Sequence, residues 1–144
     1  MLTKRTNNRP VVVVRARRQP LSAVVHHASI AGLDRHLFCS DLLSRNAPAH
    51  VAVHYFNGRY RNRNPGTFHY TEAHAHSCWE LDIIIPQGRG FVFQLEIEGR
   101  VRFIKHASTI LIPPGTRHRM EIVRGKGQMV CIVCSGNYTR SLLP

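Results

Sequence analysis

Alternation of apolar and polar residues dominates the second half of the chain. In the stretch from Phe91 to Ile97, positions 91, 93, 95 and 97 are apolar and alternate with the polar residues Gln94 and Glu96. This spacing is typical of a strand with one buried face and one face in water. The same kind of pattern predicts strands at residues 50–56, 67–76, 80–85, 91–97, 100–106, 109–112, 118–123 and 128–134.

Short segments that contain Gly or Pro separate these strands. The predicted turns are Pro86-Gln-Gly, Glu98-Gly, Pro113-Pro-Gly and Arg124-Gly-Lys-Gly, all with ordinary turn chemistry. The polar segment from Asn57 to Gly66 is predicted to be a loop. A short helix is expected only at residues 40–45, with Ser40 as its cap. Many short strands with such turns indicate an all-β fold, which is a sandwich or barrel of antiparallel strands.

Residues 1–20 form a basic N-terminal arm ahead of a single domain at residues 21–144. A disordered tail explains residues 1–10, but the four consecutive valines from Val11 to Val14 favour burial in a strand. We expect this extra strand to cover an edge of the sheet, either in its own subunit or in a partner. A homodimer is the expected assembly.

Composition supports a single core and a strongly basic surface. The chain has 144 residues, which is enough for one domain, and its Lys and Arg outnumber Asp and Glu by 20 to 8, giving a net charge of +12. Such a charge favours anionic partners, of which a small anionic metabolite fits best. Nucleic acid is a less favoured partner, because no recognition motif accompanies the charge. No long apolar run predicts a membrane span, and a cytoplasmic location is the default expectation.

Four cysteines do not suggest a disulfide framework in a chain of this length. Cys131 and Cys134 have the spacing of a redox or zinc pair, but they lie in a predicted strand, where residues three apart point to opposite faces. Candidate metal chemistry is found elsewhere in the chain.

Two segments contain residues that could bind one metal ion. His74 and His76 share a face of a predicted strand, and Glu80 opens the next strand after a short turn. A further histidine, His118, follows a Pro113-Pro-Gly turn. Three imidazole nitrogens and one carboxylate oxygen suit Fe(II), Mn(II), Ni(II), Co(II) or Zn(II) and are too rich in nitrogen for Ca(II) or Mg(II).

These two segments resemble the two motifs of the cupin superfamily, HxHxxxE and PxGxxH. The resemblance covers about the second two-thirds of the chain and implies a small antiparallel β-barrel of jelly-roll type. Carried over position by position, it makes His74, His76, Glu80 and His118 the ligands of one divalent metal ion. It implies no particular reaction, because one fold hosts many functions.

Residues next to these ligands are candidates for catalysis and substrate binding. Glu72 shares the predicted face of His74 and His76, and Asp82 shares that of Glu80, so either carboxylate could act as general acid or base or could orient a ligand. Tyr70 and Met120 are expected to line the pocket, and Arg59 and Arg117 to hold an anionic substrate. His50 and His54 share a strand face but stand too far apart to bind one ion together.

The leading hypothesis is a mononuclear metal-dependent enzyme that acts on a small anionic metabolite. Fe(II) is the expected metal and dioxygenase chemistry the expected reaction, while Zn(II), Mn(II) or Ni(II) would favour a redox-neutral isomerase, lyase or condensing enzyme. The alternative from a different class is a binding module without catalysis, in which the barrel senses a ligand and the basic arm contacts nucleic acid.

Overall fold

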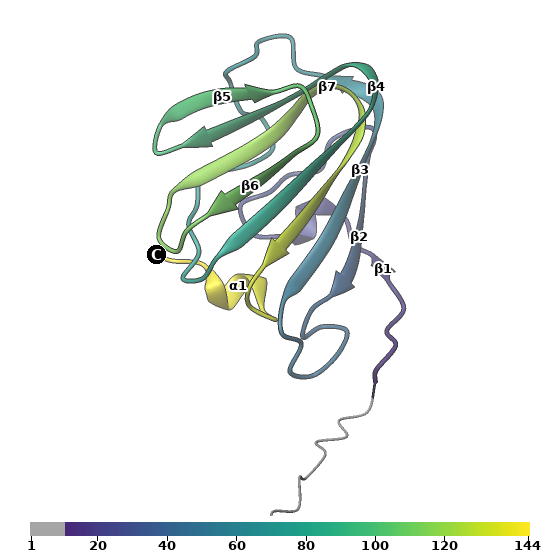
Figure 1. Ribbon diagram of the computed structural model, residues 1–144, viewed down its shortest axis with the longest axis vertical. Coiled ribbons are helices and arrows are strands. Elements are labelled where there is room, and N and C mark those ends of the chain that lie inside the picture. The colour runs from purple at the N-terminus through teal and green to yellow at the C-terminus, as the bar shows by residue number, and fades with distance from the viewer. Residues whose placement is uncertain (1–10) are drawn as a thin grey trace, which may run out of the picture.

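The computed structural model of the protein describes residues 11–144, which are almost entirely β-structure (Figure 1). The elements in chain order are β1 (Arg17–Arg18), the 3₁₀ helix η1 (Leu21–Ala23), β2 (Leu33–Cys39), β3 (His50–Arg61), β4 (Glu80–Ile97), β5 (Arg100–Ile104), β6 (Ser108–Ile112), β7 (His118–Val133) and α1 (Tyr138–Ser141). No helix in this part of the chain is long and apolar enough to cross a membrane. The prediction of an all-β fold is therefore confirmed.

All seven strands belong to one antiparallel sheet, in the order β1-β2-β3-β7-β4-β5, with β6 also paired to β4. Strand β4 pairs with β7 over almost its whole length, and β6 and β5 take successive halves of its other edge. Within residues 11–144 the hydrogen-bonded path does not return to β1, so the sheet is bent and open at its edges. The short helix α1 lies at one end of the strands (Figure 1).

Glycines inside β4 and β7 bend these strands where the sequence predicted turns. The segments around Pro86 and Arg124 do not reverse the chain, since β4 and β7 continue through both with a register shift between Gln87 and Val92. Gly125 has a φ of +95°, and a Cβ on it would lie 2.7 Å from Cα of Phe91. A glycine at such a position permits a bulge and a close approach of two backbones.

The turn between β4 and β5 follows the prediction. Glu98 and Gly99 are its two central residues, and both have positive φ, at 47° and 76°. This combination is that of a type I′ hairpin turn, whose twist matches that of the flanking strands. The turn at Pro113-Pro-Gly is also present, between β6 and β7.

Three other local predictions need correction. The valines from Val11 to Val14 form no strand, and Val11 and Val13 are each 93% exposed; the extra N-terminal strand is β1, which pairs with β2 at the sheet edge. The rest of the predicted tail, residues 1–10, lies outside the described residues. Ser40 begins a series of turns instead of a helix, and its hydroxyl accepts the N–H of Leu42. The predicted loop after Phe56 begins only at residue 62, because β3 extends to Arg61.

The segment from residue 67 to residue 76 was predicted as a strand but is irregular, with single bridges at Thr71, His74 and His76. Side chains hold it in place of a strand ladder. The buried carboxylate of Glu121 accepts the backbone N–H groups of His69, Tyr70 and Thr71. Because these backbone groups are satisfied by a side chain, the segment can depart from regular pairing and still be buried.

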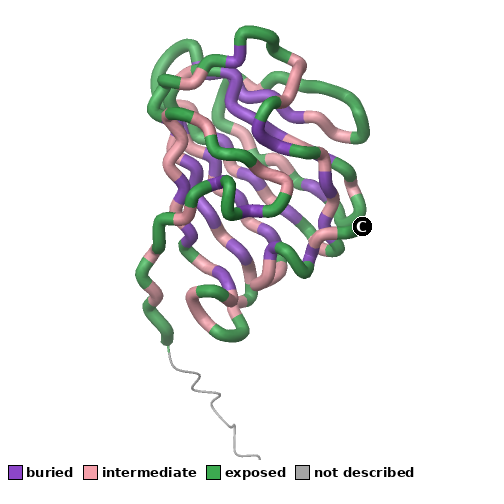
Figure 2. The backbone as a smooth tube through the Cα atoms, turned by 180° about the vertical axis from the view of Figure 1, so that it is seen from behind, coloured by how far each residue is buried: buried purple, intermediate pink, exposed green. Residues whose placement is uncertain are grey.

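The core lies on the concave side of the bent sheet. Along the strands buried residues alternate with exposed ones, as Figure 2 shows. The buried apolar cluster consists of Leu21, Val24, Phe56, Tyr70, Ile84, Phe91, Phe93, Leu95, Ile112, Met120, Ile122, Met129, Cys131, Val133 and Tyr138. The same interior also holds several histidines, three carboxyl groups and one arginine, so it is unusually polar for a core.

Candidate metal centre

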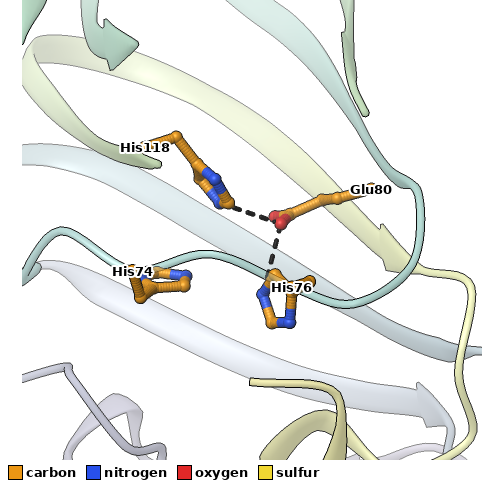
Figure 3. A group of neighbouring side chains, drawn as sticks. All are labelled: His74, His76, Glu80 and His118. Carbon is orange, nitrogen blue, oxygen red and sulfur yellow. Dashed lines mark ion pairs between the residues drawn. The ribbon is translucent and has the colours of Figure 1, made fainter. Parts of the chain in front are cut away.

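Three histidines and one glutamate meet inside the sheet. His74 and His76 come from the irregular segment, Glu80 from the start of β4 and His118 from the start of β7. Their side chains point toward one another (Figure 3), and one potential ligand atom from each lies within 4.8 Å of the others. We call these four residues the metal cluster. None of them is more than 6% exposed.

Hydrogen bonds fix which ring nitrogen of each imidazole faces the centre of the metal cluster. The Nδ1 atoms of His74 and His118 lie 2.9 Å from the carbonyl oxygens of Glu72 and Thr116, to which only a protonated nitrogen can donate. Nδ1 of His76 lies 2.7 Å from the hydroxyl of Ser141. That hydroxyl gives its own proton to the carbonyl of Tyr138, so it must accept from His76.

When neutral, all three imidazoles are therefore held as tautomers that present an Nε2 lone pair, which is the form that binds a metal. Nε2 of His76, Nε2 of His118 and Oε2 of Glu80 are buried and have no hydrogen-bond partner. Oε2 of Glu80 lies 2.9 Å from Nε2 of His118 and 3.3 Å from Nε2 of His76. Neither contact has the geometry of a hydrogen bond. Buried polar atoms that converge without partners fit a shared cation.

The electrostatics of the metal cluster agree with this arrangement. Burial would raise the pKa of Glu80, but the adjacent His118, together with His76 and His74, lowers it to about 2, so the carboxylate is charged at neutral pH. Burial lowers the pKa of His74 to about 3 and also lowers the pKa of His76, which keeps both imidazoles neutral. Burial acts against the charge on His118 too, but Glu80 outweighs it and raises the pKa. A charged carboxylate facing imidazoles is a donor set for a divalent transition metal.

A second buried carboxyl group, that of Asp82, lies close to Glu80. Asp82 is fully buried on β4 and points inward, as predicted from its position two residues after Glu80 on the same strand. Burial, reinforced by the nearby Glu80, raises the pKa of Asp82 well above its usual range. Cys131 completes the group, with its thiol donating to Oε1 of Glu80 over 3.6 Å. Whether Asp82 acts in catalysis stays a prediction.

Glu72 does not point into the interior as predicted. Its side chain is 77% exposed and accepts a hydrogen bond from Nδ1 of His26 at 2.9 Å. The prediction assumed a regular strand, in which Glu72, His74 and His76 would share a face. Because the segment is irregular at this point, side chains two residues apart do not point to the same face.

The four candidate substrate residues lie in different surroundings. Tyr70 and Met120 belong to the core cluster, and the hydroxyl of Tyr70 accepts the N–H of Ile122 at 2.7 Å. Arg59 is exposed on β3. Arg117 is exposed as well, but it lines a surface pocket of about 630 Å³ together with Glu72 and His74. Arg117 thus shares a pocket with a member of the metal cluster.

The sequence did not reveal the part that the C-terminal helix α1 plays. The hydroxyl of the buried Tyr138 lies 3.0 Å from Nε2 of His74, and Ser141 orients His76 as described above. His27 also approaches this group, with its ring centroid 5.6 Å from that of His74. These residues are more than 40 positions from their partners, and no local spacing signals them.

The fold is that of known cupin structures. A variant of oxalate decarboxylase OxdC from Bacillus subtilis superposes with a TM-score of 0.57 at 13% identity, over 94% of this chain and 33% of the decarboxylase. A cupin 2 conserved barrel domain protein from Rhodopseudomonas palustris has a TM-score of 0.51 at 17% identity, over 86% of this chain and 73% of its own. The nucleoside dehydratase Pac13 has a TM-score of 0.50 at 12% identity, over 81% of both chains.

The chain therefore has the cupin fold, and its metal cluster uses the four positions that the cupin motifs mark. No sequence profile of a protein family matches the chain, and no curated protein sequence matches it significantly. At these identities the similarity establishes the fold and not the chemistry.

Proposed function

We propose that the protein is a metal-dependent enzyme acting on a small anionic metabolite. His74, His76, Glu80 and His118 would hold one divalent transition-metal ion. The observation that carries this proposal is the convergence of three buried ligand atoms, on His76, Glu80 and His118, that have no hydrogen-bond partner. In a protein without a metal function, burying such unpaired atoms would only lower the stability of the fold, because each loses its hydration.

When bound, such an ion would supply Lewis acidity or, if it is iron, redox chemistry. The surrounding residues would orient the substrate and exclude water. Burial of the metal cluster favours strong electrostatic interactions, because water screens them poorly there. The hydroxyl of Tyr138 lies beside the Nε2 atom of His74 and would be a hydrogen-bond donor to a substrate atom in the site.

Two classes of reaction fit the donor set. Iron with dioxygenase chemistry remains our prediction from the ligand types. A redox-neutral lyase or isomerase is the second candidate, and the position of Tyr138 favours it, because a hydroxyl donor beside the ligands suits proton transfer. The names of two structural neighbours, a decarboxylase and a dehydratase, show that cupins host varied chemistry and do not decide between the two classes.

Metal content tests the proposal. Protein purified without chelators or an affinity metal would be analysed by mass spectrometry as wild type, as His76→Ala and as the control His106→Ala, which changes an exposed histidine. We expect about one equivalent of one transition metal in the wild type and the control, and a loss in His76→Ala. Iron would direct assays to oxygen consumption, and zinc, manganese or nickel to lyase and isomerase screens. No metal in the wild type would refute the proposal.

The predictions of a homodimer and of a basic arm that contacts a partner concern other surfaces of the protein. Sedimentation of the purified protein tests the first. Retention on DNA at 200 mM salt tests the second, because binding by charge alone weakens steeply as salt rises.

A further inference from the structure

A buried arginine in the interior has only neutral hydrogen-bond partners. Arg35 lies on β2, is 3% exposed, and points inward together with Leu37. Its Nε donates to Nε2 of His54 at 3.1 Å, one terminal nitrogen contacts Nε2 of His50 at 3.0 Å, and the other donates to the amide oxygen of Gln19. We call these four residues the Arg35 cluster. No carboxylate within residues 11–144 forms an ion pair with Arg35.

The two histidines of the Arg35 cluster are neutral. Burial, followed by the charge of Arg35, lowers the pKa of His50 to about 4 and that of His54 well below its usual value. Both rings thus serve as acceptors for the guanidinium, which stays protonated in proteins. A buried guanidinium is expensive unless an anion compensates it, and neutral acceptors do so only in part.

Several donors in the Arg35 cluster remain uncommitted. A guanidinium has five N–H bonds, and the three contacts above use one on each nitrogen, which leaves one on each terminal nitrogen of Arg35. Since Nε2 of His50 accepts from Arg35, its Nδ1 carries the proton, and this buried nitrogen has no hydrogen-bond partner. The Arg35 cluster therefore has three donors without a partner and one positive charge without an anion.

A pocket opens beside Gln19 and His50 of the Arg35 cluster. It has a volume of about 270 Å³, and its lining includes Gln19, His50 and Tyr138. The ring of Tyr138 lies 5.3 Å from that of His50 and 4.8 Å from that of the ligand His76. The ring of Tyr138 thus lies between the pocket and the metal cluster. At the rim, the carboxylate of Asp41 accepts the side-chain amide of Asn137.

We propose that Arg35 and His50 form a subsite for the carboxylate group of a small substrate, which enters through the pocket lined by Gln19, His50 and Tyr138. The amide oxygen of Gln19 occupies the place of one carboxylate oxygen in the ligand-free protein. The planar guanidinium fork matches a carboxylate, and charge-assisted hydrogen bonds of this kind are strong. The inference rests on the proposed function, because it assigns the substrate of that metal centre to the short carboxylates, and Tyr138 both lines this pocket and contacts His74 of the metal cluster.

The subsite is distinct from the exposed arginines that the sequence suggested. Arg59 and Arg117 lie at the surface, where water screens their charge. Arg35 lies in the interior, where an anion and a guanidinium attract each other more strongly. Its position between two inward-facing leucines of β2, Leu33 and Leu37, is the sequence signal that could have revealed it, because alternation places all three side chains on one face.

Carboxylate binding would be measured by calorimetry and by thermal unfolding with sodium succinate, against sodium chloride at equal ionic strength. The proteins are the wild type, Arg35→Gln and the control Arg102→Gln, which removes the same charge from the exposed face of β5. We expect succinate to bind the wild type and the control equally, and to bind Arg35→Gln at least tenfold more weakly. Absence of binding to the wild type, or equal binding to Arg35→Gln, would overturn the subsite.

A second variant keeps the test decisive if Arg35→Gln does not fold. Gln19→Ala removes the amide that competes for the guanidinium, so succinate should bind several-fold more tightly than to the wild type. Unchanged or weaker binding would contradict the role given to Gln19 and Arg35. Metal content is measured on the same samples. Metal without succinate binding refutes only the subsite, whereas succinate binding without metal refutes only the metal-dependent function.

Discussion

The hydroxyl of Tyr138 lies 3.0 Å from Nε2 of His74, and this contact links the C-terminal helix to the metal cluster. Since Nδ1 of His74 donates to a backbone carbonyl, Nε2 is an acceptor and the phenol is the donor. His74 is therefore the only one of the three ligand histidines whose Nε2 atom has a hydrogen-bond partner in the described part of the chain. A metal ion would compete with the phenol for that lone pair.

Tyr138→Phe should retain metal binding. The substitution removes the donor that competes for Nε2 of His74, so the affinity for zinc should equal or exceed that of the wild type. Stability of the metal-free protein should fall by about 1 kcal/mol, the typical contribution of one hydrogen bond. Competition with a chromogenic chelator and urea unfolding check the two effects. If the variant lost its metal, Tyr138 would have to be a ligand itself.

Glu121→Gln should destabilise the protein by about 2 kcal/mol or more, because three N–H groups then share one amide oxygen and face a new NH₂ donor. The irregular segment that these bonds hold carries His74 and His76, so metal affinity should fall as well. Glu98→Gln is the matched control, since this exposed carboxylate accepts one N–H, from Arg117. Equal unfolding free energies for the two variants would disprove the role of Glu121.

Gly125→Ala should cost several times more stability than Gly88→Ala. Both glycines have positive φ, at 95° and 86°, so each alanine carries a similar backbone strain of about 1 kcal/mol. Only at Gly125 would the new Cβ also meet another backbone, at 2.7 Å from Phe91, whereas nothing lies within 4 Å at Gly88. Thermal unfolding of both variants provides the comparison. Equal losses would mean that the bulge between β4 and β7 adapts freely.

Stability should fall as the pH drops below about 6.5, the usual pKa of an unfolded histidine. The pKa of His50 is about 4 in the folded state and that of His54 is also lowered, so between pH 6.5 and 4 the unfolded chain binds protons that the folded chain does not. His54→Gln keeps an acceptor for Arg35 and removes one such group. It should reduce the slope by up to about 1.4 kcal/mol per pH unit. Urea unfolding at several pH values measures the slope, and an unchanged slope would contradict the burial of a neutral His54.

Glu72→Gln should have little effect on stability or metal content. The side chain is 77% exposed, and its pair with His26 is a surface contact, which contributes at most about 1 kcal/mol. Metal analysis and urea unfolding, run beside His76→Ala, check this expectation. A loss of metal in Glu72→Gln would mean that the segment rearranges when the ion binds.

Local sequence rules predicted most strands and the four residues of the metal cluster, but they failed where a glycine could serve either a turn or a bulge and where side chains replace regular strand pairing. Gly88 and Gly125 were taken for turn residues, although in the structure they bend long strands. The alternation rule failed at Glu72, because the buried Glu121 replaces the strand ladder there with side-chain hydrogen bonds. Glycine marks freedom of the backbone, and the sequence does not say whether that freedom serves a turn or a bulge.

By itself the sequence determined the class of fold and the spacing of the ligands, because side-chain direction along a strand depends on immediate neighbours. The tertiary structure alone decided that Tyr138 reaches His74, 64 positions away, and that Arg35 faces His50 and His54 without an anion. Such contacts depend on the register between strands and on where α1 packs. They are set by long-range burial and pairing, which no local pattern in the chain encodes.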